Sequence, residues 1–596
     1  MRRKLFAFAS LCLTVLTALC GCQTAVEIPK DDLVYVVLEQ SLGICVKQDA
    51  AAVKRGESAA FEFTVEGGYV FDECSYTGKY TLVETGENRY LLTILNVRYD
   101  TRFSLSTGRV SGKVFYYLNG GTFLDESNTA DYYTQDAVLQ NHLRLNTDIG
   151  TSFKRDGYTQ TGWNTEPDGS GDHVGLGSRV TIHENQSIVL YAEWCEWSDP
   201  SLFAYETNYE SRETGDITLT EYKGEAEIDL LSIPAYINGK KVTCVSDGFT
   251  EGVKVGTLVL PNTIDTLKIG AFGQSLIDEI YLYDNLMNVS NGSFSSSLGR
   301  GIPTVHINAA MAPRYVGVND TAQFADDVDR LMLNADKKKM VFFAGCSMSY
   351  GLVSPDVEAA FGKEYFIVDT GVIGSTNAWF QFQCMLPYLG EGDVFVHAPE
   401  QMSSYQLLYK LRAEYRTFVC VEGNYDLLAQ IDCSKIGAFF DCFSEYNKIR
   451  SVLPPSDYGR KNENYNEYGD IVMPRENSPE DANYGLETLF AMHFVTEDSL
   501  RNLNEIYGQM EAKGAKVFFS FAPINKNTLT QEDIDTQSWL QFENRMREGL
   551  GYPVISSAYD YLMEGKYFYD TDYHLSEEGA SVRTQMLIRD LKKALS

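Results

Sequence analysis

The chain has 596 residues, which exceeds the roughly 250–300 residues at which single hydrophobic cores stop growing, so several domains are expected. A net charge of −32 without clusters of Lys and Arg excludes nucleic-acid binding, because phosphate contacts need such clusters. The 44% hydrophobic content argues against extensive disorder, and 38 tyrosines with 48 glycines favour β-rich, turn-rich modules.

Residues 1–22 have the layout of an export signal. A basic MRRK precedes an apolar run that is short for a membrane span, and LCGC follows. Leu19-Cys20-Gly21-Cys22 resembles the bacterial lipobox, which implies that Cys22 is diacylated and becomes the new N-terminus. We therefore expect a cell-surface lipoprotein held at the outer face of the cytoplasmic membrane by its lipid alone. A plain secretory signal is the alternative.

The segment 23–31 is predicted to be a tether, and 32–110 a β-sandwich-like module. FEFTVEGGYVF, YTLVET and RYLLTILNV alternate apolar and polar residues between glycine-rich turns. Nine cysteines follow Cys22 without a CxxC pair, so a structural zinc site is not expected. Disulfides such as Cys433–Cys442 or Cys45–Cys74 and unpaired thiols remain alternatives.

Residues 111–197 form a second module. VFYYLNGGTF opens it, GYTQTGWNTEPDGSG follows, and IVLYAEW closes it. These motifs resemble the internalin-type B repeat, a β-grasp-like module of bacterial surface proteins, and the resemblance implies a role as stalk or adhesive spacer. Trp163 and Trp194 are interpreted as buried structural aromatics, and stacking on sugars is the alternative. His173 and His183 are interpreted as surface residues.

Residues 198–312 contain a repeat. Phe249, Phe272 and Phe294 recur at intervals of 23 and 22 residues, and LVLP and IYLY are likewise 22 apart. A period in the low twenties with strand-like triplets predicts a solenoid. The sequence of these repeats resembles the short leucine-rich repeats of bacterial surface antigens. The resemblance implies one of two roles: binding of a protein or glycan ligand, or a rigid spacer.

After a linker at 313–336, residues 337–596 change to α/β character. The runs MVFFAGCS, EYFIVDTG, DVFVHAPE, AKVFFSFAP and YPVISSA are predicted strands, and helical periodicity lies between them. Strands that are apolar throughout predict a mostly parallel sheet with helices on both faces, hence a three-layer domain. Sites in such sheets form beyond the carboxyl ends of the strands, where GCS, DTGVIGSTN, APE and FAP fall.

One constellation in this domain predicts chemistry. Ser347 follows the first strand, and Asp572 and His574 precede a C-terminal helix. A serine hydroxyl needs a base to take its proton, and an imidazole needs a carboxylate to hold its tautomer. The alternative interpretations are a turn residue for Ser347 and a surface or capping residue for His574. His397 and His493 are interpreted as buried or structural.

These motifs resemble the SGNH/GDSL hydrolase superfamily, especially its cell-envelope branch with the alginate O-acetyltransferases and the lipoteichoic-acid alanylation factor. The resemblance covers 337–596. It implies that Ser347 is the nucleophile, His574 the base and Asp572 the orienting acid, and that Gly374 donates to the oxyanion. The Asp-x-His spacing matches the acetyltransferase branch.

The chain departs from the family pattern after the strand that ends at His397. Family members have Gly-x-Asn there, and the asparagine donates to the oxyanion, whereas this chain has His397-Ala398-Pro399-Glu400. Neither a proline nitrogen nor a carboxylate can donate, so one donor is expected to be missing, and Asn377 is a weak replacement.

The sequence thus predicts a multidomain surface protein, with β-rich modules and a solenoid before an SGNH-like domain. We expect an esterase or O-acyltransferase acting on an acylated polysaccharide, cell-wall polymer or host glycan, without cofactor or metal. The alternative is a non-enzymatic adhesin whose SGNH-like domain is a degenerate scaffold.

Overall fold

The computed structural model describes residues 33–596 except for internal gaps. The gaps are 40–42, 66–68, 87, 110–111, 137–143, 147–151, 182–186, 212, 291, 295–300, 312–319, 374–377, 401–414, 437–438, 453–463 and 477–494. The chain divides into two compact units, one of residues 1–115 with 184–189 and one of residues 116–183 with 190–596. In the described part, no helix is both long and apolar enough to cross a bilayer.

The first unit is made of strands, as its alternating pattern predicts. Its sheets have the orders β3-β1-β8, β2-β4-β7-β6 and β5-β9. Every second residue of Ala59–Val65 is buried, which places Phe61 and Phe63 in the core. The strands are β1 (Leu33–Leu38), β2 (Ile44–Val46), β3 (Ala50–Lys54), β4 (Ala59–Val65), β5 (Tyr69–Cys74), β6 (Tyr80–Gly86), β7 (Arg89–Ile94), β8 (Thr101–Phe103) and β9 (Leu105–Arg109).

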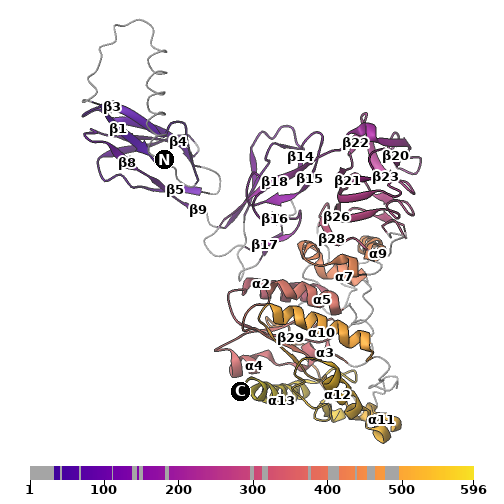
Figure 1. The fold of residues 1–596 in the computed structure, drawn as a ribbon. Coiled ribbons are helices and arrows are strands. Elements are labelled where there is room, and N and C mark those ends of the chain that lie inside the picture. Colours follow the sequence, from indigo (N-terminus) through magenta and orange to yellow (C-terminus); the bar gives the residue numbers. More distant parts are fainter. Residues whose placement is uncertain are drawn as a thin grey trace, which may run out of the picture. The chain divides into compact units, whose positions relative to one another are not determined.

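The second unit starts with a five-stranded sheet of order β12-β10-β18-β15-β16, of which Figure 1 labels β18, β15 and β16. Trp163 is fully buried, and Trp194 donates through Nε1 to the Leu118 carbonyl at 3.0 Å, so both rings are structural. The strands are β10 (Lys113–Tyr117), β11 (Thr122–Phe123), β12 (Tyr132–Asp136), β13 (Arg144–Asn146), β14 (Phe153–Lys154), β15 (Tyr158–Asn164), β16 (His173–Val174), β17 (Arg179–Thr181) and β18 (Ile188–Glu196).

Two further sheets, mostly parallel, follow in residues 203–308. In one, Lys254 of β24 pairs with Leu276 of β26, 22 residues further along the chain. The rings of Phe249, Phe272 and Phe294 form a buried row with centroids 5.9 and 5.4 Å apart, which accounts for their recurrence. The strands are β19 (Phe203–Thr207), β20 (Ile217–Tyr222), β21 (Glu227–Ser232), β22 (Tyr236–Ile237), β23 (Lys240–Val245), β24 (Lys254–Val259), β25 (Thr266–Leu267), β26 (Leu276–Tyr283), β27 (Asn288–Val289) and β28 (Thr304–Asn308).

The C-terminal region is built on a parallel sheet of order β30-β29-β31-β32. The strands are β29 (Lys339–Phe343), β30 (Phe366–Asp369), β31 (Val394–His397) and β32 (Lys516–Phe519), with a small pair β33 (Ile524–Asn525) and β34 (Leu562–Met563). Residues 552–558, expected to be a further strand, contribute one bridge between Val554 and Phe519.

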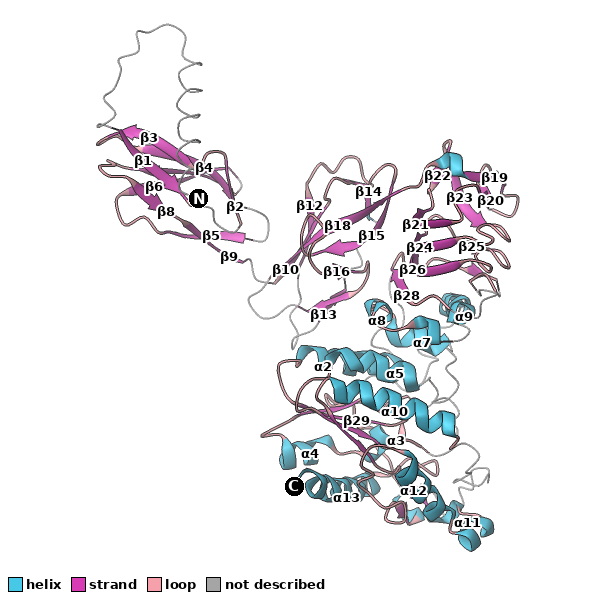
Figure 2. Cartoon of the chain, viewed as in Figure 1, coloured by secondary structure: helices cyan, strands magenta, loops and turns pink. Residues whose placement is uncertain are grey.

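Helices cover both faces of this sheet (Figure 2). Met340 and Phe342 pack with Val357 of α4 and Leu587 of α13, whereas Val341 and Phe343 belong to the core that includes α2, α5 and α10. The helices are α2 (Asp320–Leu333), α3 (Ser347–Gly351), α4 (Ser354–Phe361), α5 (Ala378–Met385), α7 (Tyr415–Val421), α8 (Asp426–Ala429), α9 (Phe439–Val452), α10 (Glu497–Ala512), α11 (Gln531–Thr536), α12 (Ser538–Gly549) and α13 (Glu577–Leu595).

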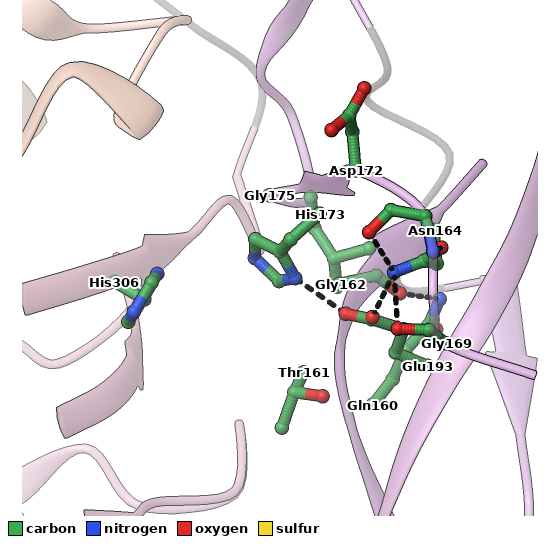
Figure 3. Close-up of polar contacts among 12 residues, drawn as sticks. Gln160, Thr161, Gly162, Asn164, Gly169, Asp172, His173, Gly175, Glu193 and His306 are labelled. Atoms are coloured by element: carbon green, nitrogen blue, oxygen red, sulfur yellow. Dashed lines mark hydrogen bonds and ion pairs between the residues drawn. The ribbon is translucent and has the colours of Figure 1, made fainter. Parts of the chain in front are cut away.

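Polar contacts join the parts of the second unit. The backbone N–H of Gly175 donates to Asp426 of α8 at 2.9 Å, and Asn308 donates through Nδ2 to the Thr161 carbonyl at 3.0 Å. Figure 3 shows His173 directed at Glu193, with Nδ1 and Oε2 2.5 Å apart. His173, expected to be a surface residue, is only partly exposed, at 26% of its side chain, because it lies among these contacts, which we call the junction. His183 lies outside the described residues.

The described cysteines form no disulfide with one another. Cys433–Cys442 and Cys45–Cys74, the two pairings that export would permit, are not made.

Candidate functional site

The candidate site lies where two neighbouring strands end. Phe343 of β29 is in register with His397 of β31, so the residues that follow each strand emerge side by side. After β29 the chain runs through Gly345 and Cys346 into α3, and after β31 it reaches Glu400. Parallel strands thus bring together two segments that are more than 50 residues apart.

A tight turn before α13 supplies the histidine. Tyr569 donates its backbone N–H to the His574 carbonyl at 2.8 Å, and the His574 N–H donates to Thr571 Oγ1 at 2.9 Å. Ser576 caps α13 by accepting from the Gly579 N–H at 3.2 Å. These bonds hold the His574 backbone between a turn and a capped helix.

The His574 ring contacts a thiol on one side and a carboxylate on the other. Its Nε2 lies 3.0 Å from Cys346 Sγ, and its Nδ1 lies 2.8 Å from Asp570 Oδ1. The ring stacks on Tyr350 with centroids 3.9 Å apart and planes 5° apart. A carboxylate on Nδ1 fixes the tautomer that leaves Nε2 free to accept a proton, so this is the arrangement of a nucleophile, base and orienting acid.

Glu400 completes the cluster. Its Oε1 accepts from the Ser347 backbone N–H at 2.8 Å and lies 3.7 Å from Cys346 Sγ. The carboxyl rests against Gly345, where an added Cβ would come within 2.8 Å of it, so a side chain at residue 345 would displace the carboxyl from its present position. Glu400 is 9% exposed and His574 8%, so both side chains are largely buried.

The predicted serine does not meet the predicted base. Ser347 is 1% exposed, and its Oγ has no hydrogen-bond partner among the described residues. His574 faces the preceding residue, Cys346, instead. The side chains of these two adjacent residues point in different directions, and their order in the sequence does not show which of them faces His574.

The predicted acid is also displaced. Asp570 holds Nδ1 of His574, and Asp572 does not. Burial raises the pKa of the Asp572 carboxyl; the Glu400 charge raises it further and His574 opposes the shift. Gly374, Asn377 and Cys22 lie outside the described residues.

Cys346 and Asp570 were missed by reasoning from the sequence. The signals were present: Cys346 stands beside Ser347 at the same strand end, and YDTDYH offers a second aspartate four residues before His574. A family pattern that expects serine and Asp-x-His spacing directs attention away from both.

The other histidine near the sheet is structural, as expected. His397 is fully enclosed, and burial lowers its pKa to about 3. Its Nδ1 lies 2.5 Å from the Tyr507 hydroxyl, a neutral partner. His493 lies outside the described residues.

Three groups in the candidate site could also ligate a metal ion. One ligand atom each from Cys346, Glu400 and His574 lies within 4.8 Å of the other two. Thiolate, imidazole and carboxylate are all ligands found in zinc sites.

Comparisons with known proteins give little guidance. No family matches the chain, and no curated protein matches it. Among solved structures, the crystal structure of protein YXIM from Bacillus subtilis shares 11% sequence identity at a TM-score of 0.22. The match covers 43% of this chain and 57% of the other, and at that TM-score it carries no argument about fold or function.

Proposed function

We propose that the C-terminal region is a cysteine-dependent acyl-ester hydrolase or acyltransferase. The observation that carries the proposal is the position of His574 between the Cys346 thiol and the Asp570 carboxylate. A nucleophile in contact with a base that an acid orients is the arrangement by which many enzymes activate a nucleophile for acyl transfer.

In the proposed reaction, Nε2 of His574 takes the Cys346 proton and the thiolate attacks the ester carbonyl carbon. The ester C–O bond breaks, the leaving alcohol takes the proton from His574, and a thioester remains on Cys346. Water or an acceptor hydroxyl then loses its proton to His574 and attacks the thioester. The products are a carboxylic acid or a new ester, and the thiol is restored.

Asp570 and Tyr350 position the base. Asp570 stabilises the imidazolium that forms when His574 is protonated, and the stacked Tyr350 ring limits rotation of the imidazole. Arg475 holds Tyr350 in turn, donating to its carbonyl at 2.9 Å and lying 5.5 Å from its ring centroid.

The finer architecture belongs to the same proposal. A parallel sheet between two helical layers supports an SGNH-like three-layer domain for 337–596. Parallel pairing at 22-residue offsets supports a leucine-rich-repeat solenoid for 198–312, and the five-stranded sheet supports the internalin-type repeat for 111–197.

The proposed substrates are acyl esters of an envelope polymer or a host glycan. The export signal and lipobox resemblance at Cys22 support this choice, because they would place the site outside the cytoplasmic membrane, anchored by the lipid. Solenoid and repeat modules would present the domain to such a polymer.

One observation favours a second candidate, a surface-binding protein with an inactive scaffold. The Ser347 N–H, which an attacked carbonyl oxygen would need, already donates to the Glu400 carboxylate. A negative charge beside the developing oxyanion opposes acyl transfer.

Mass spectrometry after incubation with p-nitrophenyl acetate separates these candidates. Wild-type full-length chain should gain one acetyl group on the peptide containing Cys346, and the adduct should disappear in Cys346→Ala. Ser347→Ala keeps the backbone N–H and should retain the adduct. An adduct on Ser347 would restore the serine mechanism, and no adduct in any variant would favour the surface-binding candidate.

A further inference from the structure

We propose that Cys346, Glu400 and His574 form a Zn²⁺ site with one coordination position open. The three groups come from three separate segments: the end of β29, the end of β31 and the turn before α13. Each contributes one ligand atom to a shared, largely buried point.

Two of the three distances between ligand atoms are close to those around a tetrahedral ion. Zinc bonds of about 2.3 Å to sulfur and about 2.0–2.2 Å to nitrogen and oxygen place neighbouring ligand atoms about 3.4–3.6 Å apart. Cys346 Sγ is 3.0 Å from His574 Nε2 and 3.7 Å from Glu400 Oε1. The third pair, between His574 and Glu400, lies within 4.8 Å, so metal binding requires side-chain rotations that draw these three groups around one ion.

The ligand chemistry favours zinc over Mg²⁺ and Ca²⁺. A thiolate and an imidazole are too soft for Mg²⁺ and Ca²⁺, which prefer oxygen donors. Three protein ligands and a fourth open position are the pattern of zinc sites that bind water or substrate. Binding releases the thiol proton of Cys346 to solvent, since the thiolate is the ligand.

The surroundings hold each ligand in place. Asp570 accepts from Nδ1 of His574, the carboxylate–histidine pair that commonly supports metal-binding imidazoles. The Glu400 carboxyl is packed against Gly345, and its Oε1 accepts from the Ser347 N–H. This explains a carboxylate at a position where acyl transfer would be better served by a donor.

Zinc would switch off the proposed acyl transfer. The ion takes the electron pairs of Cys346 Sγ and His574 Nε2, the two atoms that attack the ester and accept the proton. This inhibitory consequence rests on the proposed function, whereas the metal site rests on the geometry alone.

Cobalt titration of the reduced, EDTA-treated full-length chain tests the site. Co²⁺ binds zinc sites, and its thiolate complex has a near-ultraviolet charge-transfer band. We expect this band to saturate at one Co²⁺ per chain and to be bleached when Zn²⁺ displaces the cobalt. Cys346→Ser should abolish the band, whereas Cys45→Ser, which removes an exposed thiol elsewhere, should leave it unchanged.

Two further variants keep the thiol and test the remaining geometry. Asp570→Asn should weaken Co²⁺ binding by about 10–100-fold, the usual effect of losing a carboxylate behind a ligating histidine. Glu400→Gln should weaken it as well, because a neutral amide oxygen replaces the carboxylate. A wild-type chain without the band, or a band that persists in Cys346→Ser, would overturn the zinc site.

The metal site and acyl transfer are tested separately. Acetylation by p-nitrophenyl acetate is measured in EDTA, and the cobalt band is measured without ester. A band without acetylation leaves the metal site standing and removes the acyl transfer, and acetylation without a band does the reverse. If both occur, one equivalent of Zn²⁺ should suppress acetylation.

Discussion

Two histidines of the second unit have nearly the same immediate partners but different surroundings. His574 places Nδ1 2.8 Å from Asp570, and His173 places Nδ1 2.5 Å from Glu193. A histidine stacks on a tyrosine in both regions: His574 on Tyr350, and at the junction His306 on Tyr281 with centroids 4.1 Å apart. A carboxylate-bound histidine beside an aromatic ring is therefore insufficient to identify a reactive site.

The difference lies on the other ring nitrogen. Nε2 of His574 faces the Cys346 thiol at a strand end, whereas Nε2 of His173 is buried without a hydrogen-bond partner in the described part of the chain. The His173 ring meets the His306 ring edge to face, with centroids 5.4 Å apart. A nucleophile within reach of the base distinguishes the candidate site from the structural junction.

Replacing the thiol should have the largest effect on this comparison. Cys346→Ala should reduce hydrolysis of p-nitrophenyl acetate to background, a loss of about 10⁴-fold or more if the groups act as a unit. His173→Gln should leave the rate within about twofold, because the junction touches no reacting atom. Turnover that falls equally in both variants would mean that the losses reflect folding.

Replacing the orienting carboxylates should separate the two histidines further. Asp570→Asn should lower kcat by about 10²–10⁴-fold, because His574 loses the group that fixes its tautomer. Glu193→Gln, the matched change at the junction, should leave kcat unchanged. Asp572→Asn should cost less than about tenfold; a larger loss than in Asp570→Asn would return the role to Asp572.

Replacing Glu400 should raise the rate of acyl transfer, in contrast to the losses expected at Cys346 and Asp570. Glu400→Gln removes a negative charge beside the carbonyl and offers an amide N–H, so metal-free acyl transfer should rise by about 10–100-fold. The initial rate of acetylation in EDTA measures this. A decrease would show that Glu400 takes part in the reaction as a carboxylate.

Protonation of His173 in the junction should make the stability of the folded chain depend on pH. This is the smallest of the expected effects. Burial lowers the pKa of His173, but the hydrogen bond and charge of Glu193, with Asp426 and Glu279, raise it above its ordinary value. A raised pKa stabilises the folded state below the unfolded value of about 6.5, and this contribution is lost as pH rises through the folded value.

Chemical unfolding of the full chain, followed by tryptophan fluorescence, measures this linkage. His173→Gln should lower the unfolding midpoint more at pH 6 than at a pH above the folded pKa of His173. In a Glu193→Gln background, the effect of His173→Gln on the unfolding midpoint should lose most of its dependence on pH. A difference between wild type and His173→Gln that is constant with pH would contradict the linkage.

Much of the fold follows from local patterns. Alternation at period two marks the strands of the first unit, and apolar runs mark β29, β30, β31 and β32 because parallel strands are buried on both faces. The recurrence of Phe249, Phe272 and Phe294 reflects their burial in one row. The partial burial of His173 follows from no local pattern, because it depends on partners far along the chain, including Asp426 of α8 beside Gly175.

The apolar runs and the Asp- and His-containing segment of the sequence predict candidate chemistry at the ends of β29 and β31 and in the turn before α13. Which atoms meet there depends on contacts between segments far apart in the chain. Cys346 and Ser347 are adjacent, and Asp570 and Asp572 are separated only by Thr571, so spacing along the chain cannot rank either pair. The stacking of His574 on Tyr350 and the bond to Asp570 set the ring's orientation, and that orientation brings Nε2 to the thiol.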